Sequence, residues 1–355
     1  MNLDSPGSSP LLRAAKAGSL TLLQLLLDKG VSIRNKRHAA WTPVHEAVKA
    51  NRLHILRVLT ADFSAAELDG MISKSALPCS PLQAAFYLGS YHCAMCLINF
   101  GCDADPLSAK DLLHAAAQGG NVHLVRYLLN RKDWKLKINT HDAINRTPLH
   151  YACLFGNRQI AKLLVRRGAD PTFEAPHSVE MNTQTTPLLA CVLSASPRSH
   201  KVARMFLEHR SVDWHFSQDS LDKALALAAL KGLVEIFDLL LQNGANPNTT
   251  VIFANSQKDI PVLHWALQER SMSMLTSLLR TPEISLLSRD SVGRTALHYA
   301  CAQSDESYLL AILFFGEGKE LPPSLLGQKG WFDVLGDQDS HGWTPIDYRL
   351  RYRYP

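Results

Sequence analysis

Histidine and cysteine are the residues of this 355-residue chain whose number and spacing could support chemistry. The densest group is His92-Cys93-Ala94-Met95-Cys96, with Cys79 and Cys102 nearby in the sequence. Thiolates and imidazoles bind zinc, but zinc sites usually pair two such clusters at a defined spacing. We therefore expect no metal site, and we interpret the cluster as part of a helix in which Cys96 joins Leu97 on the buried face.

A cysteine could also act as a nucleophile, which requires a base within reach and a lowered pKa. Cys153, Cys191 and Cys301 follow or fill the small-residue positions of a recurring motif, where a free cysteine behaves as a small buried hydrophobe. No Gly-rich phosphate loop, paired-carboxylate motif or G-x-S-x-G motif is present. We predict a chain that is not an enzyme and that needs no cofactor.

The recurring motif is clearest as TPLHYA at residues 147–152. Related forms begin at Thr42, Ser80, Thr186, Thr295 and Thr344, and weaker forms lie at Ser9, Leu113 and Leu263. The prolines at positions 10, 43, 81, 148 and 187 are separated by 33, 38, 67 and 39 residues, and the interval of 67 contains the weak copy at Leu113. The threonine is placed to cap a helix, and the proline occupies the first helical position, where its missing N–H costs nothing.

A second apolar stretch at helical spacing follows most copies of the motif, as at Leu22 to Leu27 and Ile160 to Leu164. These stretches end at Gly30, Gly101, Gly168 and Gly244, where glycine tolerates the left-handed conformation after a helix. The segments 138–146 and 287–294 then read as tight turns, with Asn or Gly in the position that favours positive φ. The chain is therefore predicted to be a file of helix-turn-helix units joined by hairpin-like turns.

A period near 33 residues with this motif resembles the ankyrin repeat family. The resemblance covers about residues 8–350 and implies an all-α solenoid of stacked helix-turn-helix units with β-hairpin-like fingers. It implies a single array of about nine repeats plus a partial C-terminal one. In this family the motif histidine bonds to a loop, which implies structural roles for His45, His114, His150, His264 and His298.

Insertions interrupt the pattern at 172–185, 249–260 and 316–336, the last containing Pro322-Pro323 and Trp331-Phe332. Insertions in arrays often lie on the binding face, although a tolerated surface loop is the simpler interpretation. Residues 349–355 form a basic, aromatic tail, interpreted as a terminal cap or alternatively as a peptide for an acidic partner. Aromatic residues share the fifth motif position at Tyr151, Trp265, Tyr299 and Tyr348, which favours packing over a ligand groove.

Charge and cysteine content limit the classes of partner. The net charge of +5 and pI near 8.8 fall short of a nucleic-acid-binding composition, so no nucleic acid partner is expected. Seven cysteines, an odd number, without a cleavable signal predict the cytoplasm or nucleus. No apolar run approaches the ~20 residues of a membrane helix, and we expect a monomer that contacts no membrane.

Recognition in the ankyrin family commonly uses the finger tips and the last turn of each first helix. Carried over position by position, the resemblance implies a protein-binding set on a concave face, made of Trp41, Lys49, Tyr87, Ile144, Arg146, Phe155, Val292, Arg294, His341 and Trp343. Aromatic and arginine side chains dominate binding hot spots. We therefore predict a non-catalytic interaction scaffold or adaptor.

Two alternatives stay open. The chain could be the substrate-recognition arm of a ubiquitin ligase or of another complex, although the first repeat begins by Ser9 and leaves no room for an upstream F-box or BTB domain. It could instead be an accessory protein or an unorthodox enzyme of a metabolic pathway. A deep polar pocket beneath residues 316–336 would favour that last possibility.

Overall fold

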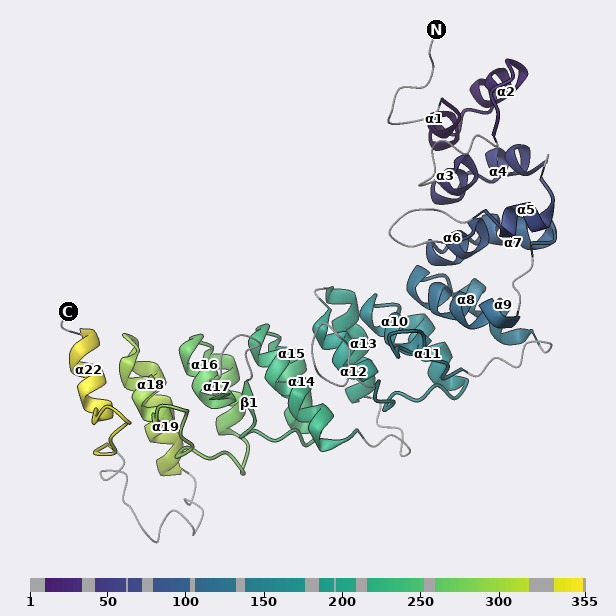
Figure 1. Ribbon diagram of the computed structural model, residues 1–355. Coiled ribbons are helices and arrows are strands. Elements are labelled where there is room, and N and C mark those ends of the chain that lie inside the picture. The colour runs from purple at the N-terminus through teal and green to yellow at the C-terminus, as the bar shows by residue number, and fades with distance from the viewer. Residues whose placement is uncertain are drawn as a thin grey trace. The chain divides into compact units, whose positions relative to one another are not determined.

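A computed structural model describes residues 10–33, 42–61, 63–71, 79–102, 106–131, 138–175, 185–194, 196–208, 216–251, 259–318 and 335–353 (Figure 1). The chain divides into two compact units. One comprises residues 1–187 and 196–202, and the other comprises residues 188–195 and 203–355. Each unit is described by itself, so the single array predicted over residues 8–350 stays a prediction.

The first unit consists mainly of helix pairs in which a first helix packs beside a second one. The pairs are α1 (Pro10–Ala17) with α2 (Leu20–Asp28), α3 (Pro43–Lys49) with α4 (Leu53–Thr60), α6 (Pro81–Tyr87) with α7 (Tyr91–Asn99), α8 (Pro106–Gly119) with α9 (Val122–Asn130), and α10 (Pro148–Leu154) with α11 (Arg158–Arg166). First helices pack on the first helices of neighbouring pairs, as α8 does on α6 and α10. A short helix, α5 (Ala65–Asp69), was not anticipated from the sequence.

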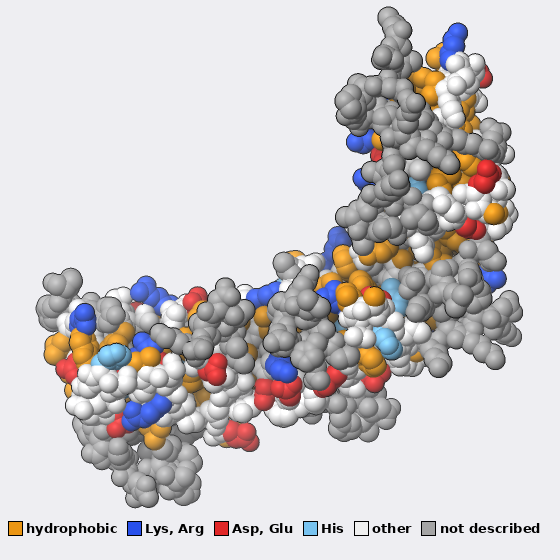
Figure 2. All heavy atoms as spheres, viewed as in Figure 1, with side chains coloured by type: hydrophobic (Ala, Val, Ile, Leu, Met, Phe, Trp, Pro, Cys, Tyr) orange, Lys and Arg blue, Asp and Glu red, His pale blue; other side chains and the backbone are white. Residues whose placement is uncertain are grey.

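The second unit continues the same arrangement. Its elements are α12 (Pro187–Leu193), α13 (Pro197–Glu208), α14 (Gln218–Leu230), α15 (Val234–Gln242), β1 (Thr250–Val251), β2 (Ile260–Pro261), α16 (Val262–Gln268), α17 (Met272–Leu279), α18 (Ala296–Ala302), α19 (Glu306–Gly318) and α22 (Pro345–Arg353). Pro187 of α12 and residues 197–202 of α13 belong to the first unit. Helix α14 lacks the threonine-proline motif, so the motif search did not find it. Figure 2 shows side chains of both charge signs interspersed over the helices of this unit.

Local sequence explains where the helices begin and end. Thr42 accepts a hydrogen bond from the backbone N–H of His45, as predicted for an N-cap, and Pro43 follows it at the first helical position. Four second helices, α2, α7, α11 and α15, end at the predicted glycines with positive φ, from +79° at Gly30 to +100° at Gly101. Helices α4, α9 and α17 end without one, at Ala61, Arg131 and Arg280. The helix starts and stops expected from the motif are therefore confirmed, and with them the ankyrin-type helical solenoid.

Hydrogen bonds join consecutive repeats at the end of each first helix. Ser90 Oγ, at the start of α7, donates to the carbonyl of Val48 in α3 at 3.1 Å. Asn157 Nδ2, before α11, donates to the carbonyl of Ala117 in α8 at 2.7 Å. In the second unit, Gln303 Nε2 after α18 donates to the carbonyl of Leu267 at 3.0 Å. Carbonyls left unpaired at a helix C-terminus are thus satisfied by the following repeat.

The interruptions of the pattern are only partly described. Ala175 and Thr185 form an isolated antiparallel bridge, and residues 176–184 between them lie outside the described residues. The 249–260 insertion begins and ends in the antiparallel pair β1 and β2, with 252–258 outside the described residues. Helix α19 extends into the 316–336 insertion as far as residue 318, while 319–334 lie outside.

The predicted tail at 349–355 is helical as far as Arg353, because α22 continues through it. Arg349 donates to the carbonyl of Gln303 at 3.0 Å and forms an ion pair of 2.6 Å with Glu306. The cation that replaces the small motif residue therefore binds the preceding repeat. The interpretation of residues 349–355 as a terminal cap, or as a peptide for an acidic partner, stays a prediction.

Candidate functional site

Each clear finger is shaped by one aspartate. Asp142 Oδ1 accepts from the backbone N–H groups of Ile144 and Arg146 at 3.0 and 2.9 Å, and Asn145 holds the turn at φ +60°. Asp290 accepts in the same way from the amides of Val292 and Arg294, and Asp339 accepts from those of His341 and Trp343. An aspartate side chain that bonds its own backbone in this way fixes a tight turn without help from other segments.

A tyrosine nine residues further along the chain binds the second oxygen of each aspartate. The phenol of Tyr151 donates to Asp142 Oδ2 at 2.7 Å. Tyr299 donates to Asp290 at 2.9 Å, and Tyr348 donates to Asp339 at 2.8 Å. These are three of the four aromatic residues of the fifth motif position, so that position ties the finger to its own helix. The recurring Asp-x8-Tyr spacing was the sequence signal for this contact.

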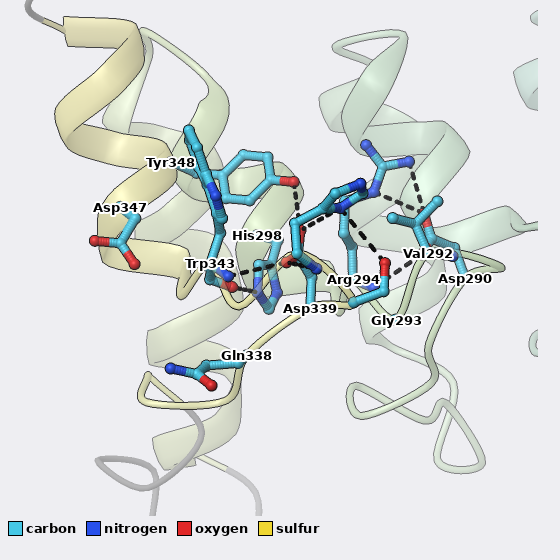
Figure 3. Close-up of polar contacts among 12 residues, drawn as sticks. Asp290, Val292, Gly293, Arg294, His298, Gln338, Asp339, Trp343, Asp347 and Tyr348 are labelled. Carbon is cyan, nitrogen blue, oxygen red and sulfur yellow. Dashed lines mark hydrogen bonds and ion pairs between the residues drawn. The ribbon is translucent and has the colours of Figure 1, made fainter.

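Figure 3 shows how two such fingers meet in the second unit. The backbone N–H of Ser340 donates to the carbonyl of Val292 at 2.9 Å, which joins the finger before α18 to the finger before α22. Arg289 pairs with Asp337 at 2.9 Å across the same junction. Four of the ten predicted binding residues lie on these two fingers: Val292, Arg294, His341 and Trp343.

The four residues differ in how their side chains are engaged. The Arg294 guanidinium pairs with Asp290 at 2.7 Å and donates to the Tyr299 hydroxyl at 2.8 Å. The Trp343 ring meets the Tyr348 ring edge-on and carries the Arg351 guanidinium 4.5 Å from its centroid. The His341 side chain is 68% exposed. The side chains of Arg294 and Trp343 are therefore engaged by their own finger or by the helix that follows it, while the His341 side chain is exposed to solvent.

Burial alone would raise the pKa of the Asp290 carboxyl, but the amide of Arg294, its guanidinium and the Tyr299 hydroxyl lower it below the usual range. Burial would also raise the pKa of Asp339, and the amides of Trp343 and His341 with the Tyr348 hydroxyl lower it. Both aspartates are therefore charged at neutral pH.

The other predicted residues lie in the first unit, apart from Trp41, which is outside the described residues. Ile144 is 45% exposed at its finger tip, and Phe155 is 42% exposed at the C-cap of α10. Lys49 is exposed, and Arg146 is half-buried. Tyr87 is half-buried. Burial raises its pKa, and a hydrogen bond with Gln118 lowers the pKa by a smaller amount. Ile144 and Phe155 are thus the large apolar members of the set that the fold leaves accessible.

The motif histidines bond to the following repeat, as the resemblance implied. His150 Nδ1 accepts from the backbone N–H of Thr147 at 3.2 Å, so the ring proton lies on Nε2, which donates to the carbonyl of Thr185 at 3.0 Å. His298 repeats this arrangement between Thr295 and the carbonyl of Trp343. Burial lowers the pKa of His150 to about 4. A neutral imidazole with a hydrogen bond at each ring nitrogen is unsuited to proton transfer.

His264 departs from the pattern. It is fully buried and stacked 5.0 Å from the Tyr299 ring, and its helix is preceded by Pro261 instead of a threonine. Neither ring nitrogen meets a partner at hydrogen-bonding geometry among the described residues. The threonine hydroxyl that contacts Nδ1 of His150 and His298 is missing here, but the backbone of Ser288 in the following finger still raises the pKa of His264 as a hydrogen-bond partner, so the loop-bonding role implied for His264 stays a prediction.

Replacing His264 by leucine should lower the free energy of unfolding at pH 7 less than the same replacement at His150, because neither ring nitrogen of His264 meets a partner at good hydrogen-bonding geometry among the described residues. Burial lowers the pKa of His264 to about 4, below the 6.5 of the unfolded chain, so stability falls as the pH falls from 6.5 toward 4. The leucine variant should lose that part of the acid sensitivity, at most about 1.4 kcal/mol per pH unit. Urea titrations at several pH values measure both effects.

The control is His150→Leu, which leaves the amide of Thr147 unpaired and removes one of the two hydrogen bonds to the carbonyl of Thr185, whose other donor is the amide of Ala175. It should cost about 1–3 kcal/mol at pH 7. Equal losses in the two leucine variants would show that His264 makes bonds of the same value as His150.

Burial raises the pKa of three of the cysteines considered as ligands or nucleophiles, namely Cys93, Cys102 and Cys301. The pKa of Cys93 rises to about 11, that of Cys102 to about 12 with a contribution from Asp69, and that of Cys301 to about 11. A thiol that stays protonated at neutral pH is a poor nucleophile and a poor metal ligand. In α7, Cys93 lies with Leu97 on the buried face. Cys96, which was predicted to lie there, is half-buried instead.

No group of three or more His, Cys, Asp or Glu side chains that could hold a metal ion occurs within the part of the chain that the structure describes. Across the same residues, no helix has the length and apolar character needed to cross a membrane.

Sequence comparisons agree with this architecture. Models of ankyrin repeats match residues 11–60, 82–175 and 223–250. A putative ankyrin repeat protein of fowlpox virus is 30% identical over 149 residues, which are 42% of this chain and the whole length of the viral protein. The chain belongs to the ankyrin repeat family.

Other ankyrin relatives are much longer than this chain. The ankyrin repeat and KH domain-containing protein mask-1 of Caenorhabditis elegans is 27% identical over 49% of this chain, which is 6% of that protein. The human transient receptor potential cation channel subfamily A member 1 is 28% identical over 47% of this chain and 15% of its own length. The chain therefore spans only a small part of these relatives.

Among solved structures, the ankyrin repeat domain of Bcl-3 matches with a TM-score of 0.48 at 23% identity, covering 66% of this chain and 92% of that domain.

Proposed function

We propose that this ankyrin chain is a non-catalytic protein-interaction module that binds its partner with the finger tips and the C-terminal ends of the first helices. The observation that carries the proposal is the exposure of Ile144 and Phe155, 45% and 42%, on a backbone fixed by Asp142. Large apolar side chains held in place lose little conformational freedom when a partner covers them. That property is typical of binding hot spots.

The distance between the two residues fits one contact patch. Ile144 precedes the seven-residue helix α10 and Phe155 caps its end, so they are separated by about 10 Å along the helix axis. A standard interface covers about 800 Å² on each partner, which is wide enough to include both. Arg146, between them in sequence, adds a half-buried cation at the edge of this patch.

The odd number of cysteines favours the cytoplasm or nucleus as the place where the module acts. A role as the recognition arm of a larger complex is a special case of the same activity, and co-purification with ligase subunits would support it.

Replacing Phe155 and Arg146 together by alanine should weaken partner binding at least about tenfold, because both side chains belong to hot-spot types. The finger should stay folded, since the bonds of Arg146 to Asp142 use its backbone. A partner captured from native lysate, identified by mass spectrometry and then purified, allows the dissociation constant to be measured by calorimetry. Thermal unfolding of the variant should match that of the wild type.

A matched control is Leu25→Ala with Lys29→Ala, which also removes one exposed large apolar side chain and one cation, but from the second helix of the first repeat. It should leave the dissociation constant unchanged. Equal weakening by both variants, or a lowered melting temperature of the Phe155 and Arg146 variant, would count against the finger surface.

A further inference from the structure

Three consecutive second helices of the first unit expose a set of basic side chains, here called the basic face. It consists of exposed residues on α9, on α11 with its C-cap, and on the first turns of α13, namely Arg126, Arg158, Lys162, Arg166, Arg167, Arg198 and Lys201. These positions are distinct from the fingers discussed above.

Helical spacing aligns the cations. Arg158, Lys162 and Arg166 follow one another at intervals of four residues, so they form a row on one side of α11 with about 6 Å between successive members. The opposite side of the helix is buried through Ile160, Ala161 and Leu164. The row therefore faces outward along the full length of α11.

Contacts between the helices join the rows into one surface. Arg167 Nη2 donates to Asn130 Oδ1 at 3.1 Å, which connects the end of α11 to the end of α9. At the other end of α11, the amide of Arg158 donates to the carbonyl of Gly156, and Gly156 packs directly against the backbone and Cβ of Arg198. The cations of the three helices thus lie on neighbouring elements of one packed layer.

No acidic residue neutralises this face from within. Helices α9 and α11 and residues 197–202 contain no Asp or Glu. Among the described residues, none of the seven cations forms an ion pair, whereas in the second unit Arg204 pairs with Glu208 and Lys223 pairs with Asp219. An uncompensated row of like charges raises the local potential and attracts anions.

The charge of the whole chain is divided in the same way. The first unit contains 23 Lys and Arg against 14 Asp and Glu, and the second contains 14 against 18. The units therefore carry +9 and −4, which together give the net +5 of the chain. The modest total charge conceals a strongly basic unit.

We propose that the basic face binds an acidic segment of a protein partner. Five of its seven cations are arginines, whose planar guanidinium groups bind carboxylates through two parallel hydrogen bonds. Single-stranded nucleic acids need exposed aromatic rings for stacking, and membrane surfaces favour apolar groups that insert. None of the exposed large hydrophobic side chains of the described residues lies on α9, α11 or α13, which favours a carboxylate-rich protein segment.

The test uses the full chain and a fluorescein-labelled peptide in which two glutamates alternate with two alanines. Binding is followed by fluorescence anisotropy at physiological salt. The variant R158E/K162E/R166E should weaken binding about tenfold or more. The control K16E/K29E/R57E changes the same net charge at exposed positions of other helices and should change binding less than about twofold. A second variant, R126E/R198E, should act in the same direction as the first from the neighbouring helices.

Three outcomes would overturn the proposal. One is failure of the wild-type chain to bind the peptide, and another is equal weakening by the face variant and the control. The third is tighter binding of an RNA oligonucleotide or of phosphatidylserine vesicles than of the peptide, with loss of that binding in the face variant. The Phe155 and Arg146 variant should bind the peptide normally, so failure here is separate from failure of the finger surface.

Discussion

Replacing Gly89 by alanine should lower the free energy of unfolding by about 2–5 kcal/mol. Gly89 has φ +66°, which disfavours any residue with a Cβ, and an added Cβ would lie 2.4 Å from the carbonyl oxygen of Gly119. The obstacle is backbone at the end of α8, so a side-chain rotation cannot relieve it. Urea unfolding followed by circular dichroism measures the loss.

Gly30→Ala separates the cost of positive φ from the cost of a clash between the added Cβ and the backbone. Gly30 also has positive φ, +79°, but a Cβ there would meet no atom within 4 Å. Its replacement should cost about 1–2 kcal/mol from backbone strain alone. If Gly89→Ala were no more damaging than Gly30→Ala, the close approach of α6 and α8 would be absent in solution.

Replacing Asp290 by alanine should cost about 3–5 kcal/mol, the range found when one partner of a buried ion pair is removed. The Asp290 side chain is 1% exposed, its partner Arg294 is 27% exposed, and Tyr299 donates to the same carboxylate. The variant leaves a guanidinium, a phenol and two backbone amides without their acceptor. Chemical denaturation of the second unit at pH 7 tests this value.

The same contacts fix the sign of the pH dependence. Because the folded pKa of Asp290 lies below that of an unfolded carboxyl, near 3.9, its contribution to stability is complete above pH ~4. It is lost as the pH falls from there through the folded pKa. The stability difference between wild type and variant should therefore shrink below pH 4.

Asp142→Ala provides a matched comparison, because Asp142 accepts from two amides and a tyrosine but has no arginine partner at its side chain. It should cost about 1–3 kcal/mol. A loss at Asp290 no larger than the loss at Asp142 would mean that the ion pair with Arg294 adds nothing.

The repeat pattern predicted the fold well because its signals are local. The capping threonine, the proline after it and the glycine after several second helices each act on residues close to them in sequence. Their roles at Thr42, Pro43 and Gly30 could therefore be read from spacing alone. Helix α14 was missed since Ser217 caps it without the motif.

The candidate site was harder to predict because side-chain engagement depends on contacts made after folding. Arg294 was chosen as a binding residue by its type, and its guanidinium proved to be paired with Asp290. His264 was assigned a loop bond by the motif, and the sequence did not show that the residue before its helix, proline here, provides no hydroxyl to contact its ring. Exposure of Ile144 and Phe155 followed from their positions at a turn tip and a helix end, which spacing does reveal.

Each hydrogen bond between repeats joins a residue to one that lies tens of residues away in the sequence, so it can form only after the later repeat has been made. The imidazoles of His45 and His150 bond to backbone carbonyls 34 and 35 residues further along the chain. The carbonyl of Val48 accepts from Ser90, which lies 42 residues further along. During synthesis at about 5–20 residues per second, each repeat therefore stays incompletely bonded for seconds after it leaves the ribosome. A ribosome that pauses after one repeat would leave that repeat without the hydrogen-bond partners that the next repeat supplies. The timing of translation therefore affects the order in which the repeats become stable.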